Sequence, residues 1–453
     1  MAVDLVVRNG VVVTPETTVE GGVAIEDGII VAVGSALPDG EKELDAQGNY
    51  IFPGLLDPHV HFRDPGLTYK EDFTTGSTAA VYGGVTSVLD MPNVKPITST
   101  PEQILHREKL LEDKSYVDIM LVGVVVQENP DQIIPMAKAG AIGFKVFLGS
   151  TIGNIPPPDD GVLLDALGYV AETGLRIGFH AENDQILQHR IRQLKAAGRT
   201  DPLAHLESRP AVAEAESIQR MALFAKYTGA KIHIYHLSSK DGMELIAEYK
   251  DKGIDITTET GPHYMFLSDK DYAEMGPVIR MNPPVRSKEH GEALWQGILD
   301  GRVDFIADDH SPHTEEEKMR DNIWEAISGF LGVETLMQVT YSESVVKRDM
   351  SVNHFVKVCS ENGARVWHCY PQKGALLPGS DGDITVFDPN RTWQIDRHQL
   401  HSKNRVTPWH LWEGQGLPVG TIVRGQVMMW DREFVAERPG GKLVRPSVNG
   451  VGT

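Results

Sequence analysis

Cysteine is scarce in this chain, and long apolar runs are missing. Only two of the 453 residues are cysteines, Cys359 and Cys369. A secreted protein of this length usually carries more, so we expect a reducing, cytoplasmic location and two buried, unpaired thiols. No stretch reaches the roughly 18 apolar residues of a membrane span. The N-terminal segment has Asp4 among its apolar residues and reads as a strand rather than a signal peptide. We therefore expect no membrane partner.

Basic residues are also in short supply. The chain has 43 lysines and arginines against 63 acidic residues, a formal net charge of −20. Such a surface repels phosphate backbones, so we expect no nucleic-acid partner. No GxGxxG motif follows the early apolar runs, and no GxSxG elbow is present, which argues against dinucleotide binding and serine-nucleophile hydrolysis. What remains is ordinary globular composition, with 41% hydrophobic and 23% charged residues.

Both ends of the chain have the pattern of short strands joined by tight turns. Residues 4–14 and 21–34 place Asn-Gly or Asp-Gly between apolar runs, a strong hairpin signal. The same pattern returns in residues 382–389 and 420–437. We predict one small β-sandwich domain built from residues 1–51 and 376–453.

The middle of the chain, residues 52–375, alternates short apolar runs with helical stretches. About eight such units in roughly 320 residues predict an α/β fold, a (β/α)8 barrel of the TIM type. An open doubly wound sheet is the alternative. Residues 150–161 form a loop rich in proline and glycine directly after one predicted strand, and we consider both a lid over the site and a plain surface loop.

Polar side chains end one apolar run after another in this middle region. Barrel enzymes place their active residues at the carboxyl ends of the strands, so these side chains are expected to meet at one mouth. Taken singly, each is weak evidence, because a lone histidine at a strand end is often structural. The candidates at these positions are His59, His61, Lys145, His180, His236 and Asp309.

The first two candidates carry the strongest signal. His59 and His61 are two positions apart, and the period-two geometry of a strand points both imidazoles to the same face. Two imidazole nitrogens on one face suit a single divalent metal ion. His233 and His263 are interpreted instead as structural histidines or as groups that support the ligands. The pattern as a whole predicts a metal-dependent hydrolase.

Lys145 lies in the run AIGFKVFLG, with apolar residues on both sides. A lysine that ends a strand usually extends its ammonium to solvent. Burial at the barrel mouth would instead lower its pKa and leave the amine neutral more often. A neutral amine can add carbon dioxide and become a carbamate. The motif alone does not establish this modification.

The motifs resemble those of a known family. DPHVHFRDPGLTYKEDF, DMPN, GFKVFL, HAEN, HLSS, MNPPVRS, DDHSPHTEEEK and KGALLPGSDGDITVFDP are similar to the cyclic amidohydrolases of the amidohydrolase superfamily. This group includes dihydroorotase, allantoinase, dihydropyrimidinase and hydantoinase. The resemblance covers nearly the whole chain, and the motifs occur in the order found in the family.

The resemblance implies a site with two divalent metal ions, usually zinc. His59, His61 and Asp309 would hold one ion, and His180 and His236 the other. Carboxylated Lys145 would bridge the two. Asp309 would act as general base and then as general acid while a small cyclic amide is opened. Relatives of this kind are commonly homodimers or homotetramers, so the resemblance also implies a homo-oligomer.

The choice of ring depends on fewer residues. Arg63 shares the face of His61 if the strand geometry persists, and a guanidinium there suits a substrate carboxylate. In motifs like those of dihydroorotases, the residues that contact substrate correspond here to Arg63, Asn93, Asn282 and His313. Arg63 makes dihydroorotase the first choice, with N-carbamoyl-aspartate as product in pyrimidine biosynthesis.

Other features favour the related rings. Tyr264 stands where dihydroorotases often have a second histidine, and residues 373–389 look as much like allantoinase or hydantoinase as dihydroorotase. An allantoinase or a hydantoinase and dihydropyrimidinase-type enzyme is therefore the alternative. A catalytically inactive binding or scaffold relative is the remote one, because all six ligand-type residues are present.

Overall fold

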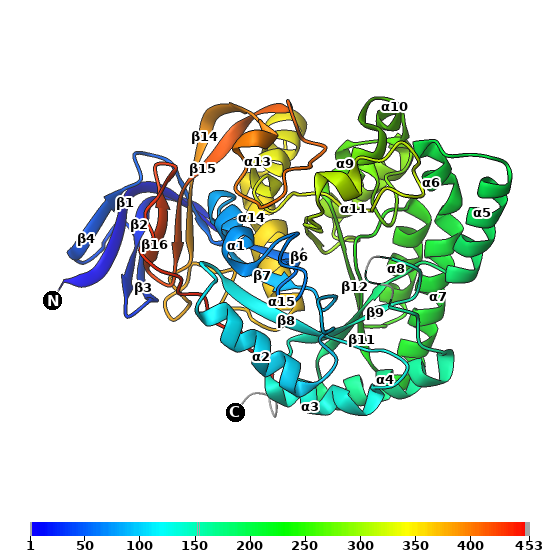
Figure 1. The fold of residues 1–453 in the computed structure, drawn as a ribbon. Helices are drawn as coiled ribbons and strands as arrows, with labels where there is room; N and C mark the ends of the chain where they lie inside the picture. The colour runs from blue at the N-terminus through cyan, green and yellow to red at the C-terminus, as the bar shows by residue number, and fades with distance from the viewer. Residues whose placement is uncertain (1, 152, 154, 449–453) are drawn as a thin grey trace.

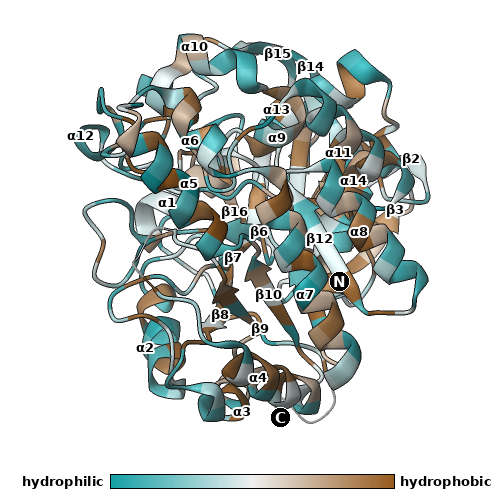
Figure 2. Ribbon diagram, turned by 90° about the vertical axis from the view of Figure 1, so that its right-hand side faces the viewer, coloured by the Kyte–Doolittle hydropathy of each residue, from teal (hydrophilic) through white to brown (hydrophobic). Residues whose placement is uncertain are grey.

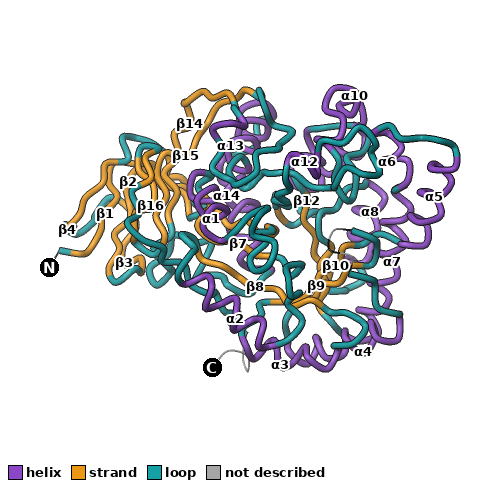
Figure 3. Tube along the Cα trace, viewed as in Figure 1, coloured by secondary structure: helices purple, strands orange, loops and turns teal. Residues whose placement is uncertain are grey.

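The middle and the two ends of the chain form different sheets in the computed structural model, which describes residues 2–151, 153 and 155–448. The middle contributes an eight-stranded parallel sheet, orange in the centre of Figure 3. Its strands follow the chain in order: β6 (Leu55–Val60), β7 (Val85–Asp90), β8 (Asp118–Val124), β9 (Gly143–Phe147), β10 (Arg176–His180), β11 (Lys231–Ile234), β12 (Ile256–Thr260) and β13 (Phe305–Ile306). Each matches one of the apolar runs, so the predicted barrel is confirmed.

The barrel closes between its first and last strands. Val60 at the end of β6 forms a parallel bridge with His310, and the His61 amide donates to the His310 carbonyl at 2.8 Å. Almost every strand residue is buried, as expected for a parallel sheet covered on both faces. Figure 2 shows hydrophobic residues on strands such as β8 and β9 and on parts of the surrounding helices.

Helices surround the barrel strands, as Figure 1 shows. The segments between β6 and β11 contain α1 (Phe73–Tyr82), α2 (Pro101–Glu112), α3 (Ile133–Ala139), α4 (Asp160–Thr173), α5 (Asp184–Ala196), α6 (Pro202–Ser208) and α7 (Ala211–Thr228). Later segments contain α8 (Lys240–Asp251), α9 (Pro262–Phe266), α10 (Tyr272–Met275), α11 (Lys288–Asp300), α12 (Glu315–Lys318), α13 (Leu336–Tyr341), α14 (Val352–Val356) and α15 (Asn362–Val366). Short 3-10 turns lie at Pro130–Gln132, Asp269–Asp271, Gly276–Ile279 and Arg397–Gln399, and π-helical turns at Ser342–Val346 and Lys357–Glu361.

The two chain ends join in one nine-stranded sheet beside the barrel, at the left of Figure 1. Most of its neighbouring strands are antiparallel, and β1 is parallel to β4 and β5. One apolar cluster contains side chains from strands at both ends of the chain, which explains why neither end needs a core of its own. Its strands are β1 (Val3–Val13), β2 (Thr18–Glu26), β3 (Ile29–Gly34), β4 (Gly40–Asp45), β5 (Tyr50–Pro53), β14 (Ile384–Gln394), β15 (Glu413–Val423), β16 (Gln426–Trp430) and β17 (Glu433–Phe434).

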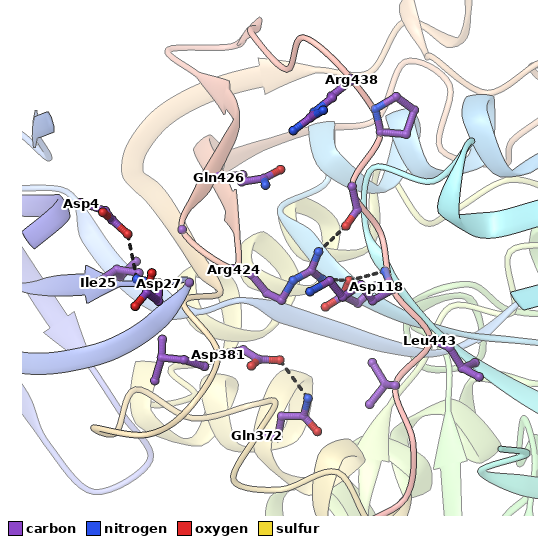
Figure 4. Close-up of a pocket in the computed structure, with 17 residues that line it drawn as sticks. Asp4, Ile25, Asp27, Asp118, Gln372, Asp381, Arg424, Gln426, Arg438 and Leu443 are labelled. Carbon is purple, nitrogen blue, oxygen red and sulfur yellow. Dashed lines mark hydrogen bonds and ion pairs between the residues drawn. The ribbon is translucent and has the colours of Figure 1, made fainter. Parts of the chain in front are cut away.

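The segment after β17 returns to the barrel. Leu443 bridges Ile119 near the start of β8, so this contact lies at the amino-terminal ends of the strands. A cavity of about 710 Å³ lies where the end sheet, the barrel and this segment meet. Figure 4 shows Asp118 and Arg424 paired there, with Asp381 hydrogen-bonded to Gln372. This junction is far along the barrel strands from the predicted metal ligands, which follow the opposite strand ends.

No helix within the described part of the chain is long and apolar enough to cross a membrane. The proposed lid, residues 150–161, includes two positions, 152 and 154, that lie outside the described residues. Helix α4 begins at Asp160, inside this segment. Its closure over the site stays a prediction.

Candidate metal centre

A pocket at the carboxyl ends of the barrel strands brings together eight of the ten residues predicted from sequence. Thr151, Met281, Ser311 and Ser328 also contribute to its lining. The predicted residues that line it are His59, His61, Asn93, Lys145, His180, His236, Asn282 and Asp309. Arg63 and His313 are absent from this lining.

Two histidines and one aspartate form a compact group at the bottom of the pocket. One ligand-type atom from each of His59, His61 and Asp309 lies within 4.8 Å of the others. Asp309 Oδ1 is 3.3 Å from His59 Nε2 and 3.2 Å from His61 Nε2. The other nitrogen of each ring is engaged: His59 Nδ1 donates to Glu259, and His61 Nδ1 donates to the Asn93 amide oxygen at 2.7 Å. Both Nε2 atoms are thereby left as acceptors that point to one place.

The remaining ligand-type side chains complete the arrangement. His180 Nδ1 lies 3.0 Å from His236 Nε2, and Lys145 Nζ lies 3.1 Å from His59 Nε2. His180 Nε2 is 2.9 Å from a Glu182 carboxylate oxygen. Imidazole and carboxylate donors at this spacing fit divalent metal ions.

Burial tunes the protonation of these groups. Burial, more than any neighbouring charge, lowers the pKa of His59, His61 and His236 well below the ordinary value, so the rings are neutral and able to bind metal. Burial lowers the pKa of Lys145 to about 8, against the attraction of Asp309 and Glu259. Burial also raises the pKa of Asp309 to about 7, against the positive charges of Lys145 and Arg63.

The backbone is strained at this site. Asp309 has φ +55° and His236 has φ +40°, in the left-handed region that side chains other than glycine rarely adopt. Such residues cost free energy and gather at functional sites, where the surrounding structure holds them in place. The strain sits on two of the predicted ligands.

Arg63 differs from the simple expectation. Strand β6 ends at Val60, and Arg63 itself has φ +61°, so the alternation that would place it beside His61 does not continue. Its Nη2 donates to Ser311 Oγ at 2.8 Å and lies 3.3 Å from His313 Nε2. Arg63 is 1% exposed and sits behind Ser311, which lines the pocket. Its contact with substrate stays a prediction, as does that of His313.

Three residues that support the ligands escaped the sequence analysis. Glu259 on β12 accepts from both His59 and His233, and Glu182 pairs with His180. The ring of Tyr235 lies 4.0 Å from Lys145 Nζ and forms the floor under that amine. His233 thus supports a ligand, as expected. The HAEN motif could have pointed to Glu182, which is part of it, but no sequence motif pointed to Glu259.

Comparison with known proteins agrees with this geometry. The model of the amidohydrolase family matches residues 50–428. The chain belongs to the amidohydrolase family. This amidohydrolase is 34% identical to an allantoinase from Solibacter usitatus, over 98% of each chain. It is also 34% identical to an L-hydantoinase from Paenarthrobacter aurescens, over 97% of this chain and 98% of the relative.

Solved structures give the same result. The L-hydantoinase (dihydropyrimidinase) from Arthrobacter aurescens superposes with a TM-score of 0.95 at 33% identity, covering 98% of this chain and all of the other. A dihydropyrimidinase from Brevibacillus agri superposes with a TM-score of 0.91 at 30% identity, over 98% of each chain. The family and the activity predicted from sequence, hydrolysis of cyclic amides, are confirmed. These relatives favour the alternative ring class over dihydroorotate, the first choice.

Proposed function

We propose that this amidohydrolase opens hydantoin-type cyclic ureides, the ring that hydantoins share with allantoin. The supporting observation is that all six ligand-type side chains meet at one end of the barrel, and that this barrel superposes on hydantoinases. Similarity to allantoinases and hydantoinases decides the ring class. A scaffold role would not need a complete set of buried ligands.

We infer that two divalent metal ions occupy this centre, with zinc as the first candidate. His59, His61 and Asp309 would hold one ion, and His180 and His236 the other. The lowered pKa of Lys145 favours a neutral amine, whose nitrogen can bond to the carbon of carbon dioxide and release a proton, giving a carbamate that would serve as a further ligand. When bound, the ions supply Lewis-acid polarisation of the ring carbonyl and lower the pKa of water.

The residues of the chain would then move the proton. Asp309 lies among the ligand-type side chains at the pocket, where its carboxylate can accept a proton and return it. Water oxygen bonds to the ring carbonyl carbon, and Asp309 takes the proton that the water gives up. The carbon–nitrogen bond breaks as Asp309 donates that proton to the leaving ring nitrogen. Asn282 lines the pocket and is placed to orient the ring. Its Oδ1 accepts a hydrogen bond from Ser328 Oγ at 3.0 Å.

The proposal is tested with a panel of hydantoin, allantoin, dihydrouracil and dihydroorotate. The enzyme is assayed as purified, after chelation, and after reloading with zinc or manganese. We expect turnover of a hydantoin-type ring that chelation abolishes and metal restores. Asp309→Asn should lower kcat by about 10²- to 10⁴-fold. Turnover of dihydroorotate alone would instead support a dihydroorotase, the first choice from sequence. If the metal-loaded protein hydrolyses none of the rings, the proposal is rejected.

A further inference from the structure

A second cavity adjoins the metal-centre pocket and extends away from the strand ends. Its volume is about 500 Å³, and it shares Thr151, Asn282 and Ser328 with the inner pocket. Its other walls come from the loop after β9, from residues 280–282, and from the segment 317–328 after β13. We call it the outer cavity. A group attached to a ring in the inner pocket reaches it past these three shared side chains.

The inner pocket is small. It offers about 20 Å³, room for about one water molecule. A five-membered ring that approaches the ligands must therefore displace or move lining side chains, and any substituent on that ring must point outwards. The outer cavity is the adjoining space that can receive it. Its lining then contributes to the choice among substituted rings.

Cations without carboxylate partners distinguish this cavity. Arg280 lines it, and its Nη1 donates to the Ile323 carbonyl. Behind it, buried Lys318 donates to the carbonyls of Arg280 at 2.7 Å and Ile327 at 3.1 Å. Among the described residues, no ion pair includes Arg280 or Lys318. Within the described part of the chain, no carboxylate compensates the positive charge of Arg280, and its buried Nε has no hydrogen-bond partner.

Other charged groups nearby do not compensate the positive charge of Arg280. Arg209 also lines the cavity, but Glu182 pairs with it. Burial first, and then the charge of Arg209, lower the pKa of Arg280 to about 9. Burial and the charge of Arg280 likewise lower the pKa of Lys318. Arg209 and Arg280 therefore lie close enough to repel one another, which an anion at Arg280 would relieve, whereas the lowered pKa of Lys318 favours its neutral amine.

The acidic groups of the cavity are paired or exposed to solvent. Glu317 pairs with Lys70 at 2.8 Å, whereas Glu325 is exposed and accepts from the neutral Asn322 amide at 3.0 Å, so solvent screens its charge. Arg320 pairs with Glu316 at 3.5 Å, but both are exposed and the pair is screened by solvent. In a chain of net charge −20, a largely buried arginine without an ion-pair partner in a cavity beside the candidate metal centre suits an anionic ligand better than a neutral one.

We propose that the outer cavity binds an anionic substituent, so that this enzyme prefers cyclic ureides whose ring substituent ends in a carboxylate. The inference rests on the proposed function for its chemistry. Arg280 acts here as a specificity-determining residue: it contacts the substituent and takes no part in ring opening. A guanidinium can meet a carboxylate with two parallel hydrogen bonds, which a neutral amide cannot reproduce.

The test compares two hydantoins that differ only at the substituent end, 5-(2-carboxyethyl)hydantoin and 5-(2-carbamoylethyl)hydantoin. For the zinc-loaded wild type we expect kcat/KM for the acid to exceed that for the amide about tenfold, mainly through KM. High salt should reduce the ratio. Arg280→Met should bring the ratio close to one, while Arg280→Lys keeps part of the preference. Arg192→Met removes an exposed arginine on α5 outside the cavity and should leave the ratio unchanged.

Equal kcat/KM for the two hydantoins with the wild type would overturn the inference, even if both are hydrolysed. The same holds if Arg280→Met folds and keeps the preference. Should Arg280→Met fail to fold, the wild-type ratio and its salt dependence still decide. If no ring is hydrolysed, the proposed function fails, and calorimetric binding of the acid against the amide tests the cavity separately.

Discussion

His59, one of the candidate ligands, is oriented by a carboxylate that does not line the pocket. Glu259 lies 200 residues from His59 in the sequence, yet it accepts from His59 Nδ1 and lies 3.3 Å from His233 Nε2. Because Nδ1 keeps its proton for Glu259, Nε2 presents its lone pair to the site. Partners of this kind fix the ring orientation and raise the basicity of the ligand nitrogen.

Replacing that partner is expected to weaken metal binding more than folding. Burial raises the pKa of Glu259 well above its usual value, so this side chain is neutral in the metal-free protein. Glutamine is neutral too, and Glu259→Gln should therefore change the free energy of unfolding little. A carboxylate partner makes the His59 ring a stronger metal ligand than an amide partner does. We therefore expect the zinc affinity of Glu259→Gln to fall about 10- to 100-fold. Competition with a chromogenic chelator measures this.

The control for this experiment is Glu248→Gln, which breaks only an exposed pair with Lys252 on α8. Zinc affinity should be unchanged in that variant. If Glu259→Gln also binds zinc as tightly as the wild type, the carboxylate is not what holds His59 in place.

At the scale of elements, strand β10 shows why one small residue is needed inside the barrel. Gly178 pairs in register with Lys145 on β9 and His233 on β11. A Cβ at Gly178 would overlap the Tyr235 ring, the same ring that lies under the Lys145 amine. The glycine thus makes room for the aromatic floor of the metal centre.

Gly178→Ala is therefore expected to destabilise the protein by about 1–3 kcal/mol, because the core has no space for the methyl group. Urea unfolding measures the loss. Gly168→Ala is the matched control in α4, since a Cβ there meets no atom within 4 Å. In a helix interior alanine is favoured over glycine, so this variant should gain about 0.4–1 kcal/mol. A similar effect of both substitutions would contradict the steric explanation.

At the scale of the whole molecule, one buried lysine joins the end sheet to the barrel. Lys373 Nζ lies 2.5 Å from Asp118 on β8, 2.9 Å from Asp381 and 2.8 Å from Asp383, just before β14. Burial disfavours its charge, but Asp118, Asp383 and Asp381 outweigh that effect and raise the pKa of Lys373. Its contribution to stability is fully present below about pH 10 and is lost only as the pH rises through the raised pKa.

Lys373→Met removes the cation shared by three buried carboxylates; Asp118 keeps its ion pair with Arg424, but Asp381 and Asp383 lose theirs. At about pH 8 we expect a loss of roughly 3–5 kcal/mol in the free energy of unfolding. Burial already raises the pKa of Asp383, so protonation should relieve the variant as the pH falls towards about 5.5. Urea unfolding at both values should show the variant gaining stability at low pH relative to the wild type.

Lys240→Met, which breaks an exposed pair with Glu289, should leave unfolding unchanged at either pH. A loss for Lys373→Met that is equal at both pH values would mean that packing, not charge, holds the junction.

Local sequence patterns account for the barrel and most of the centre. Eight apolar runs predicted the strands, and polar residues in or just after five of these runs predicted the six ligand-type side chains. This works because the carboxyl ends of all parallel barrel strands meet at one mouth, whichever helices lie between them. Paired hairpin signals at both ends predicted the second β domain for a similar reason, since neither end alone can bury its apolar face.

Only the tertiary structure decided how those side chains are held and what surrounds them. The period-two rule carried Arg63 onto the face of His61, but the left-handed backbone at Arg63 turns it behind Ser311. The partner of His59 and the cations of the outer cavity come from segments far apart in the chain. Periodicity describes neighbours along one strand, whereas hydrogen bonds and uncompensated charges depend on which distant segments pack together. The sequence by itself determined the barrel and predicted its ligand-type side chains; packing determined how those side chains are oriented and left Arg280 without an ion-pair partner in the outer cavity.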